Sequence, residues 1–204
     1  MNERFDKAAK DWDKSDTRTR FSEGIGRAIL EHVPLRPEMK VMDFGAGTGL
    51  LSAHIAPKVA KIAAVDISRG MLEELAAKSE FEGKVLPFCQ NIVHDPLDED
   101  FDGIVSAMAL HHVEDTEEIV KVFFEHLKPG GFVALADLDK EDGTFHTHGN
   151  EGVYHFGFER SALQAMLEGA GFSEVRFATA YTFEKENGRS YPVFLVTARR
   201  EVAD

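Results

Sequence analysis

Apolar residues occur along this chain in two alternating patterns. Short continuous apolar runs, typical of buried strands, occupy residues 40–44, 61–67, 84–90, 101–110 and 131–138. Segments whose apolar residues lie three or four positions apart, typical of helices, occupy residues 20–33, 49–59, 69–81 and 114–128. Strands that alternate with helices of this length predict βαβ units, and therefore a parallel sheet with both faces covered.

The pattern changes near the C-terminus. A helix over residues 159–172 contains Gly171 as its stop signal, and two strand-like runs follow at 173–183 and 190–200. The dipeptide Asn187-Gly188 between them favours a tight hairpin turn, so these strands should be antiparallel neighbours. The sequence therefore predicts an α/β fold with a doubly wound, mostly parallel sheet that ends in an antiparallel hairpin.

Residues 139–158 interrupt this rhythm with the stretch "DKEDGTFHTHGNEGVYHFGF". Long loops inside a compact domain often serve as functional lids, and aromatic residues here are apolar enough to cover a pocket. We therefore expect one domain over residues 1–204, with a helical cap segment at 1–33 and a lid at 139–158.

Composition and charge narrow the class of protein. The chain has 204 residues and a net charge of −13, from 36 acidic and 23 basic residues, without the basic cluster that a nucleic-acid binder needs. No apolar run reaches the roughly 18 to 20 residues of a membrane span, and the N-terminus is more charged than a signal peptide. The single cysteine, Cys89, suits a reducing compartment. We expect a cytoplasmic protein that binds no nucleic acid and does not insert into membranes; the oligomeric state stays open.

The stretch "VMDFGAGTGL" at residues 41–50 carries the strongest chemical signal. Gly45, Gly47 and Gly49 lie between an expected strand and an expected helix. Glycine allows positive φ and lets a ligand approach the backbone, and ligands of open α/β sheets bind at the carboxyl ends of strands, where this loop lies. A plain turn needs one glycine rather than three, so the loop predicts a bound ligand.

Two acidic residues limit what that ligand is. Asp66 ends the second strand, 21 positions after Gly45, where an acid can accept both ribose hydroxyls of an adenosine group. Asp43 lies two positions before Gly45, and Leu50 stands where a dinucleotide fingerprint has its third glycine. The spacing disfavours a nicotinamide-dependent oxidoreductase but leaves that alternative open, and no Gly-Lys-Ser/Thr follows for phosphoryl transfer.

Five segments in order resemble class I S-adenosylmethionine-dependent methyltransferases. These are "VMDFGAGTGLLS", "VDIS", "FDGIVSAMALHHVED", "HLKPGGFVALADLD" and "LEGAGFSEV", and the resemblance spans roughly residues 20–200. It is closest to the small-molecule branch called methyltransferase type 11 or ubiquinone-biosynthesis-like. The resemblance implies a Rossmann-like seven-stranded sheet whose last strand is antiparallel, with S-adenosylmethionine as cofactor and S-adenosylhomocysteine as product.

The resemblance also implies roles for individual residues. The glycine loop would run beneath the methionine and ribose, Asp43 would hold the loop and the ammonium group, and Asp66 would take the ribose hydroxyls. Ile67 would contact the adenine, Ile92 would donate its N–H to the ring, and Asn91 would accept from the adenine amino group, where the family commonly has aspartate. The full set expected to bind the cofactor is Trp12, Asp43, Gly45, Ala46, Gly47, Thr48, Gly49, Asp66, Ile67, Ser68, Met71, Asn91, Ile92, Ala107 and Met108.

Histidines supply the candidate acid–base chemistry. His111 and His112 follow the fourth strand, and either could deprotonate an oxygen or nitrogen acceptor, because imidazole titrates near neutral pH. His146, His148 and His155 in the lid have a spacing that could bind zinc. The family mostly needs no metal, so we expect none.

These expectations combine into one function with two alternatives. We expect methyl transfer from S-adenosylmethionine to a small-molecule acceptor by in-line displacement, with alignment as the main contribution of the protein. A catalytically inactive S-adenosylmethionine-binding regulatory protein is the first alternative, and an NAD-dependent oxidoreductase is the second. The sequence does not identify the acceptor.

Overall fold

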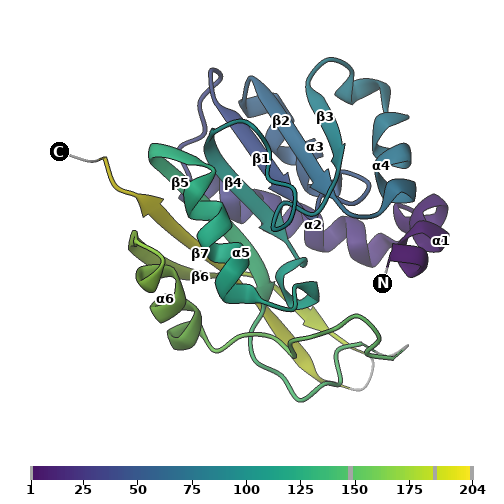
Figure 1. Ribbon diagram of the computed structural model, residues 1–204. Helices are drawn as coiled ribbons and strands as arrows, with labels where there is room; N and C mark the ends of the chain where they lie inside the picture. The colour runs from purple at the N-terminus through teal and green to yellow at the C-terminus, as the bar shows by residue number, and fades with distance from the viewer. Residues whose placement is uncertain (1, 147–148, 186–187, 203–204) are drawn as a thin grey trace.

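A seven-stranded sheet forms the centre of the molecule (Figure 1). The computed structural model describes residues 2–146, 149–185 and 188–202. The strands are β1 (Lys40–Phe44), β2 (Lys61–Asp66), β3 (Val85–Cys89), β4 (Phe101–Ala107), β5 (Leu127–Leu138), β6 (Phe172–Glu184) and β7 (Ser190–Arg200). Their order is β3-β2-β1-β4-β5-β7-β6, with β1 to β5 parallel and β7 antiparallel to both β5 and β6. The predicted α/β sheet with its antiparallel hairpin is confirmed.

Helices cover both faces of the sheet, as the continuous apolar strands require. They are α1 (Asn2–Trp12), α2 (Asp16–His32), α3 (Leu50–Ile55), α4 (Arg69–Ala76), α5 (Thr116–Glu125) and α6 (Arg160–Gly169), with short 3₁₀ turns η1 (Ala56–Lys58), η2 (Ser79–Phe81) and η3 (Leu110–His112). Apolar side chains of α2, α3 and α4 pack into one core beneath the sheet, and those of α5 and α6 into another. No helix in the described part of the chain is long and apolar enough to span a membrane.

Several element boundaries differ from the sequence-based expectation. The helix expected at 114–128 ends as α5 at Glu125, because His126 caps it and its Nδ1 donates to the Val122 carbonyl. Strand β5 then begins at Leu127, ahead of the expected start at 131. The helix expected at 49–59 is shortened to α3 and then tightens into η1 around Pro57, which cannot continue an α-helix.

The C-terminal hairpin and the segment 139–158 lie at the same end of the molecule (Figure 1). Lys185 and Arg189 close the hairpin through a backbone hydrogen bond, and Gly188 has φ +77°. Asn187, the other half of the expected turn signal, lies outside the described residues. The segment leaves β5 at Asp139 and returns at Phe158, where the two residues form an isolated bridge.

Candidate functional site

The three glycines after β1 each have positive φ, of +69°, +55° and +85°, but for different reasons. A Cβ at Gly45 would lie 2.3 Å from the Ala109 Cβ, and one at Gly49 would lie 2.7 Å from the Phe81 ring. A Cβ at Gly47 would meet nothing within 4 Å. Gly45 and Gly49 therefore let the loop pack against its neighbours, whereas Gly47 exposes backbone to an open space at the carboxyl end of β1.

The carboxyl groups of Asp43 and Asp66 fix the glycine loop and the start of the helix after it through hydrogen bonds. Ser52 donates to Asp43 Oδ2 at 2.6 Å, and burial raises the pKa of Asp43 to about 7. Asp66 accepts from the Gly47 N–H at 2.8 Å through Oδ2 and from the Ser68 N–H at 2.8 Å through Oδ1. Burial also raises the pKa of Asp66 above its usual range. The end of β2 is thereby fixed beside the one glycine that faces open space.

Helix α1 is tied across this loop from outside the sheet. Asp6 accepts from Ser68 Oγ at 2.6 Å and from the Gly70 N–H at 2.8 Å, at the start of α4. Asp13 accepts from Thr48 Oγ1 at 2.5 Å, in the glycine loop itself. Figure 1 shows α1 beside α4 at one end of the sheet. The N-terminal segment therefore contacts both the glycine loop and the start of α4.

The backbone is strained just after the end of β4. Met108 has φ +57°, one of two positive values on non-glycine residues in the described ranges. Its N–H donates to the Ala136 carbonyl at 2.8 Å, and Ala107 and Met108 pack against the core cluster under the glycine loop. A non-glycine residue in this conformation costs about 1 to 3 kcal/mol and often occurs at functional sites.

Next along the chain, η3 presents His111 and His112. His111 is buried, its Nδ1 lies 2.7 Å from Asp137 Oδ1, and its backbone N–H donates to Asp137 Oδ2 at 3.2 Å. Burial acts to raise the pKa of Asp137, but the attraction of His111 and the hydrogen bonds from His111 and the Leu138 N–H together lower that pKa below its usual range. Nδ1 of His112 lies 2.6 Å from the Gly152 carbonyl oxygen. Burial, aided by His111, lowers the pKa of His112 to about 4.

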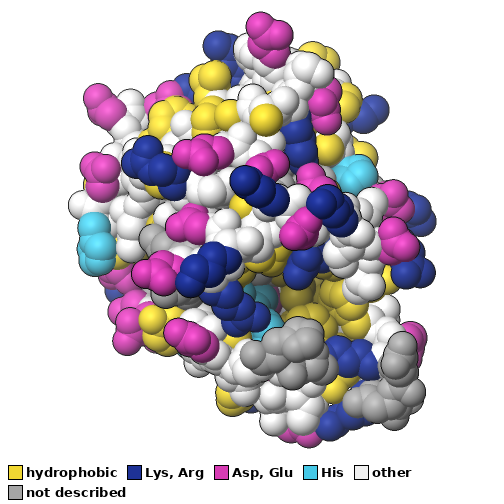
Figure 2. Space-filling view, turned by 90° about the vertical axis from the view of Figure 1, so that its right-hand side faces the viewer, with side chains coloured by type: hydrophobic (Ala, Val, Ile, Leu, Met, Phe, Trp, Pro, Cys, Tyr) yellow, Lys and Arg dark blue, Asp and Glu magenta, His cyan; other side chains and the backbone are white. Residues whose placement is uncertain are grey.

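His146 brings the segment 139–158 against this pair. Its ring centroid lies 5.2 Å from that of His111 and 6.0 Å from that of His112. Burial lowers the pKa of His146, and its Nδ1 is buried without a hydrogen-bond partner. Figure 2 shows a hollow on this side of the molecule, with hydrophobic and histidine side chains inside it and Lys and Arg around it.

The segment 139–158 is anchored at several points. Arg160 forms a bidentate ion pair with Asp139 at 2.7 Å, and the Phe145 ring packs on Phe183 and Tyr191. Lys185 at the hairpin tip donates to the Phe145 carbonyl. The segment therefore packs against β6 and β7 while carrying His146 toward η3.

Comparison with known proteins identifies the family. A family model described as a methyltransferase domain matches residues 15–176. The chain belongs to this family.

Individual relatives agree with that assignment. The chain is 31% identical over 154 residues to an uncharacterized methyltransferase of Schizosaccharomyces pombe, covering 66% of this chain and 54% of that protein. It is 30% identical over 160 residues to phosphoethanolamine N-methyltransferase 1 of Arabidopsis thaliana, covering 73% of this chain and 32% of that protein. The chain thus spans about half or less of these relatives. The methyltransferase family implied by the five motifs is confirmed.

A solved structure shares the fold. Phosphoethanolamine N-methyltransferase 2 of Haemonchus contortus, solved in complex with S-adenosyl-L-methionine, superposes with a TM-score of 0.71 at 15% identity, covering 97% of this chain and 60% of that one. At this identity the likeness establishes the fold of the methyltransferase domain alone.

The residues expected around an adenine lie along one edge of the methyltransferase domain. Ile92 and Met71 are buried, and the Cys89 thiol lies 4.0 Å from the Ile67 carbonyl oxygen. Asn91 is exposed, and its Oδ1 accepts from the Val93 N–H at 3.1 Å. The amide therefore shapes its own turn in this structure, and whether it contacts adenine stays a prediction.

Trp12 lies at the end of α1, where Arg18 stacks 3.8 Å above its ring. Phe5 packs edge-on against Trp12 on one side, with ring centroids 5.8 Å apart, and against His112 on the other, 5.3 Å apart. This position is compatible with a Trp12 that anchors the helix and with one that closes the site.

The structure brings together a different set of histidines from the set that their spacing in the sequence predicts. His155 points elsewhere, since its Nε2 lies 2.8 Å from the Val113 carbonyl oxygen and 3.0 Å from Thr116 Oγ1. His148 lies outside the described residues. The structure joins His146 to His111 and His112 instead. Asp137 was not predicted as a site residue, and its only signal in the sequence is an acidic residue inside an apolar strand.

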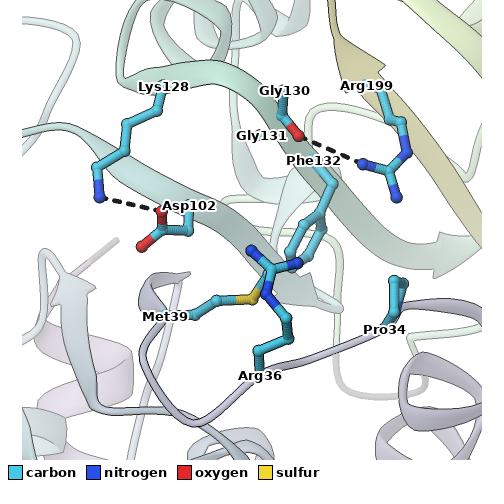
Figure 3. Close-up of a pocket in the computed structure, with 9 residues that line it drawn as sticks. All are labelled: Pro34, Arg36, Met39, Asp102, Lys128, Gly130, Gly131, Phe132 and Arg199. Atoms are coloured by element: carbon cyan, nitrogen blue, oxygen red, sulfur yellow. Dashed lines mark hydrogen bonds and ion pairs between the residues drawn. The ribbon is translucent and has the colours of Figure 1, made fainter.

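A second pocket lies at the opposite end of the strands (Figure 3). Its polar groups face one another: Lys128 pairs with Asp102, and Arg199 donates to the Gly130 carbonyl. It lies at the amino ends of the parallel strands, whereas ligands of such sheets bind at the carboxyl ends.

Proposed function

We propose that this chain is an S-adenosylmethionine-dependent methyltransferase acting on a small-molecule acceptor. The observation that carries the proposal is the open space at Gly47, beside Asp66 and at the carboxyl end of β1. A Cβ at Gly47 would project into that space, so the backbone there can lie directly against a cofactor. Membership of the methyltransferase-domain family supports the same cofactor.

The residues around the loop fit such a cofactor. Asp66 has two carboxylate oxygens at the loop, each with a further lone pair that can accept a ribose hydroxyl. Asp43 holds the base of the loop through Ser52. We propose cofactor contacts at Trp12, Asp43, Gly45, Ala46, Gly47, Thr48, Gly49, Asp66, Ile67, Ser68, Met71, Asn91, Ile92, Ala107 and Met108.

When bound, the cofactor supplies a methyl group already activated on a sulfonium sulfur. The chain then has to align an acceptor atom with that methyl group, and alignment can supply about 7 to 11 kcal/mol of barrier reduction. The strained turn at Met108 joins β4 to η3, and Ala109 in this turn lies against Gly45, so the cofactor end and the histidine end are adjacent.

His111 is the better candidate for a general base. A carboxylate can only accept, so the Nδ1–H of His111 donates to Asp137 and leaves the lone pair on Nε2. That nitrogen can take the proton of an acceptor O–H or N–H as the new bond to the methyl group forms, and Asp137 stabilises the resulting imidazolium. His112 has the same orientation against the Gly152 carbonyl but a pKa of about 4, which makes it the weaker base.

The surrounding segments complete the proposal. We propose that residues 1–204 act as one domain, with 1–33 as a cap over the cofactor and 139–158 as a lid over the acceptor. The hydrogen bond from Arg4 to the Glu151 carbonyl at 3.1 Å links these two covers. The absence of a basic cluster from the sequence supports a small-molecule partner over nucleic acid, and the single, exposed Cys89 supports a cytoplasmic location.

The names of two similar proteins support the substrate class. The Arabidopsis thaliana relative is named for a small phosphorylated amine, and the Haemonchus contortus structure holds S-adenosyl-L-methionine. These facts belong to those proteins, and a fold alone does not determine a reaction. The acceptor of this chain therefore has to be found by experiment.

Thermal unfolding and calorimetry with S-adenosylhomocysteine and NAD test the proposal. We expect S-adenosylhomocysteine to stabilise the protein, by about 2.7 kcal/mol at 100 times its Kd, and NAD to leave it unchanged. Asp66→Asn should weaken binding about 10- to 100-fold, because it removes charge-assisted hydrogen bonds worth about 1.5 to 3 kcal/mol. Asp98→Asn, at an exposed carboxyl, is the matched control.

Stabilisation by NAD alone would identify the oxidoreductase alternative, and no response to either ligand would refute the proposed cofactor. Binding of S-adenosylhomocysteine without turnover of S-adenosylmethionine on any of a panel of hydroxyl, amine and carbon acceptors would favour the inactive regulatory alternative.

A further inference from the structure

Three histidines from two distant segments lie close together at the histidine end of the candidate site. One ring nitrogen from each of His111, His112 and His146 lies within 4.8 Å of the other two. The first two are neighbours in η3, with ring centroids 4.1 Å apart, and the third comes from the segment 139–158. Within the described ranges, this is the one group of histidine, cysteine or acidic side chains close enough to share a metal ion.

The hydrogen bonds of the pair in η3 set which nitrogens are available. Nδ1 of His111 donates to a carboxylate, and Nδ1 of His112 donates to a backbone carbonyl, since neither oxygen can donate. Each neutral ring therefore carries its lone pair on Nε2. A histidine that binds a metal almost always donates its other ring N–H to a carboxylate or a carbonyl, which fixes the tautomer and the ring orientation. Both supports are present here.

His146 adds an independent observation. Its Nδ1 is buried and has no hydrogen-bond partner, an arrangement that costs free energy unless a ligand satisfies the atom. Nearly all buried polar atoms in proteins are paired, so an unpaired imidazole nitrogen next to two oriented lone pairs indicates a missing partner.

We propose that His111, His112 and His146 bind one divalent transition-metal ion, of the Zn²⁺ type. Three imidazoles are a known ligand set for zinc, which takes four ligands in tetrahedral geometry and keeps one position open at catalytic sites. The all-nitrogen set disfavours Mg²⁺ and Ca²⁺, which prefer oxygen ligands. The proposal replaces the expectation that the chain needs no metal, and it uses a different group from His146, His148 and His155.

The open position gives the site a use that rests on the proposed methyl transfer. An oxygen or nitrogen atom of the acceptor can occupy it, which would hold that atom at the histidine end of the hollow (Figure 2). A proton and a metal ion use the same Nε2 lone pairs. With the ion bound, His111 and His112 would be ligands that orient the acceptor rather than proton acceptors, and the proton of the acceptor would pass to solvent, because a bound ion lowers the pKa of the group on it.

Metal titration of the full chain tests the site directly. The protein is dialysed against a chelator and titrated with Co²⁺, whose visible absorption reports tetrahedral nitrogen ligands, and Zn²⁺ is then added to displace it. We expect one ion per chain for the wild type. His146→Ala and His112→Ala should each weaken binding at least 10-fold, whereas His94→Ala, at an exposed histidine outside the cluster, should bind like the wild type.

Binding of S-adenosylhomocysteine to the same metal-free samples separates the two proposals and shows that each variant is folded. His146 is the safer position, because its side chain loses no hydrogen bond when it is truncated. Failure of the wild type to bind Co²⁺ would overturn the metal site, and so would equal Co²⁺ affinity in the wild type and His146→Ala. Neither result would affect the proposed cofactor.

Discussion

The two ends of the candidate site are built in different ways. At the cofactor end, residues within one short stretch form the glycine loop, and Asp66 accepts from the backbone N–H groups of Gly47 in that loop and of Ser68. At the histidine end, His111 depends on Asp137, 26 positions later, and the cluster is completed by His146 from the segment 139–158. The strand, loop and helix at the first end are specified by one short stretch of sequence, whereas the second end is assembled only from side chains of segments far apart in the chain.

This contrast predicts the most damaging substitution at the histidine end. His111→Leu would leave the Asp137 carboxylate buried without the imidazole N–H that donates to it, and leaving a buried charge uncompensated costs about 3 to 5 kcal/mol. His146→Leu, in the same cluster, should change the free energy of unfolding by less than about 1 kcal/mol, because no hydrogen bond is lost. Urea denaturation measures both. Equal losses would show that the cluster, rather than the buried pair, carries the stability.

At the cofactor end, Asp43 predicts a dependence of stability on pH. Burial raises its pKa from 3.8 to about 7, so between these values the unfolded chain ionises the group and the folded chain does not. The free energy of unfolding should therefore fall as pH rises from about 4 to about 7, by at most about 4 kcal/mol at 1.36 kcal/mol per pH unit.

Asp43→Asn removes this contribution while keeping an acceptor for Ser52. The stability of the wild type relative to this variant should decrease between pH 4 and pH 8, measured by denaturant unfolding without cofactor. Asp98→Asn, at an exposed carboxyl, serves as the control. A difference between wild type and Asp43→Asn that stays constant with pH would mean that Asp43 is ionised in the folded protein.

The same contrast explains what the sequence could predict. The strands, the helices and the glycine loop depend on residues within about ten positions of one another, so their periodicity and spacing were sufficient. The antiparallel hairpin was predicted for the same reason. The end of α5 was predicted too late, because the stop signals Pro129 and Gly130 lie beyond His126, whose side chain already caps the helix.

The histidine end could not be predicted, because the spacing of His146, His148 and His155 suggested a cluster within one loop. The fold instead turns His155 toward Val113 and brings His146 to η3. The positive φ of Met108 had no sequence signal either, since methionine has no preference for that conformation. Contacts between distant segments and strained backbone are properties of the assembled fold.

A smaller effect is expected at Gly45. Gly45→Ala would force a non-glycine residue to φ +69° and place its Cβ 2.3 Å from Ala109, for a combined cost of about 3 kcal/mol. Gly83→Ala, at φ +68° with nothing within 4 Å, should cost only about 1 kcal/mol. Adding Ala109→Gly should restore part of the loss at Gly45 and none at Gly83. Thermal unfolding of the four variants distinguishes the close contact from the backbone conformation.

The smallest effects are expected for the contacts that hold α1, and the turn after it, against the cofactor end and the histidine end of the site. Asp13 binds Thr48 and Lys78 beside the glycine loop, whereas Arg4 donates to Glu151 in the segment 139–158. These contacts are partly exposed, so Asp13→Ala and Arg4→Ala should each change global stability by less than about 1 kcal/mol. Local opening of α1 is more sensitive to these substitutions than global stability is. The hydrogen-exchange rate of the α1 amides should rise about 5-fold in Asp13→Ala. It should rise less in Arg4→Ala, because Asp13 makes two contacts and Arg4 makes one. A larger rise in Arg4→Ala would mean that α1 is held mainly by the histidine end, and that the cap over the cofactor depends on the lid over the acceptor.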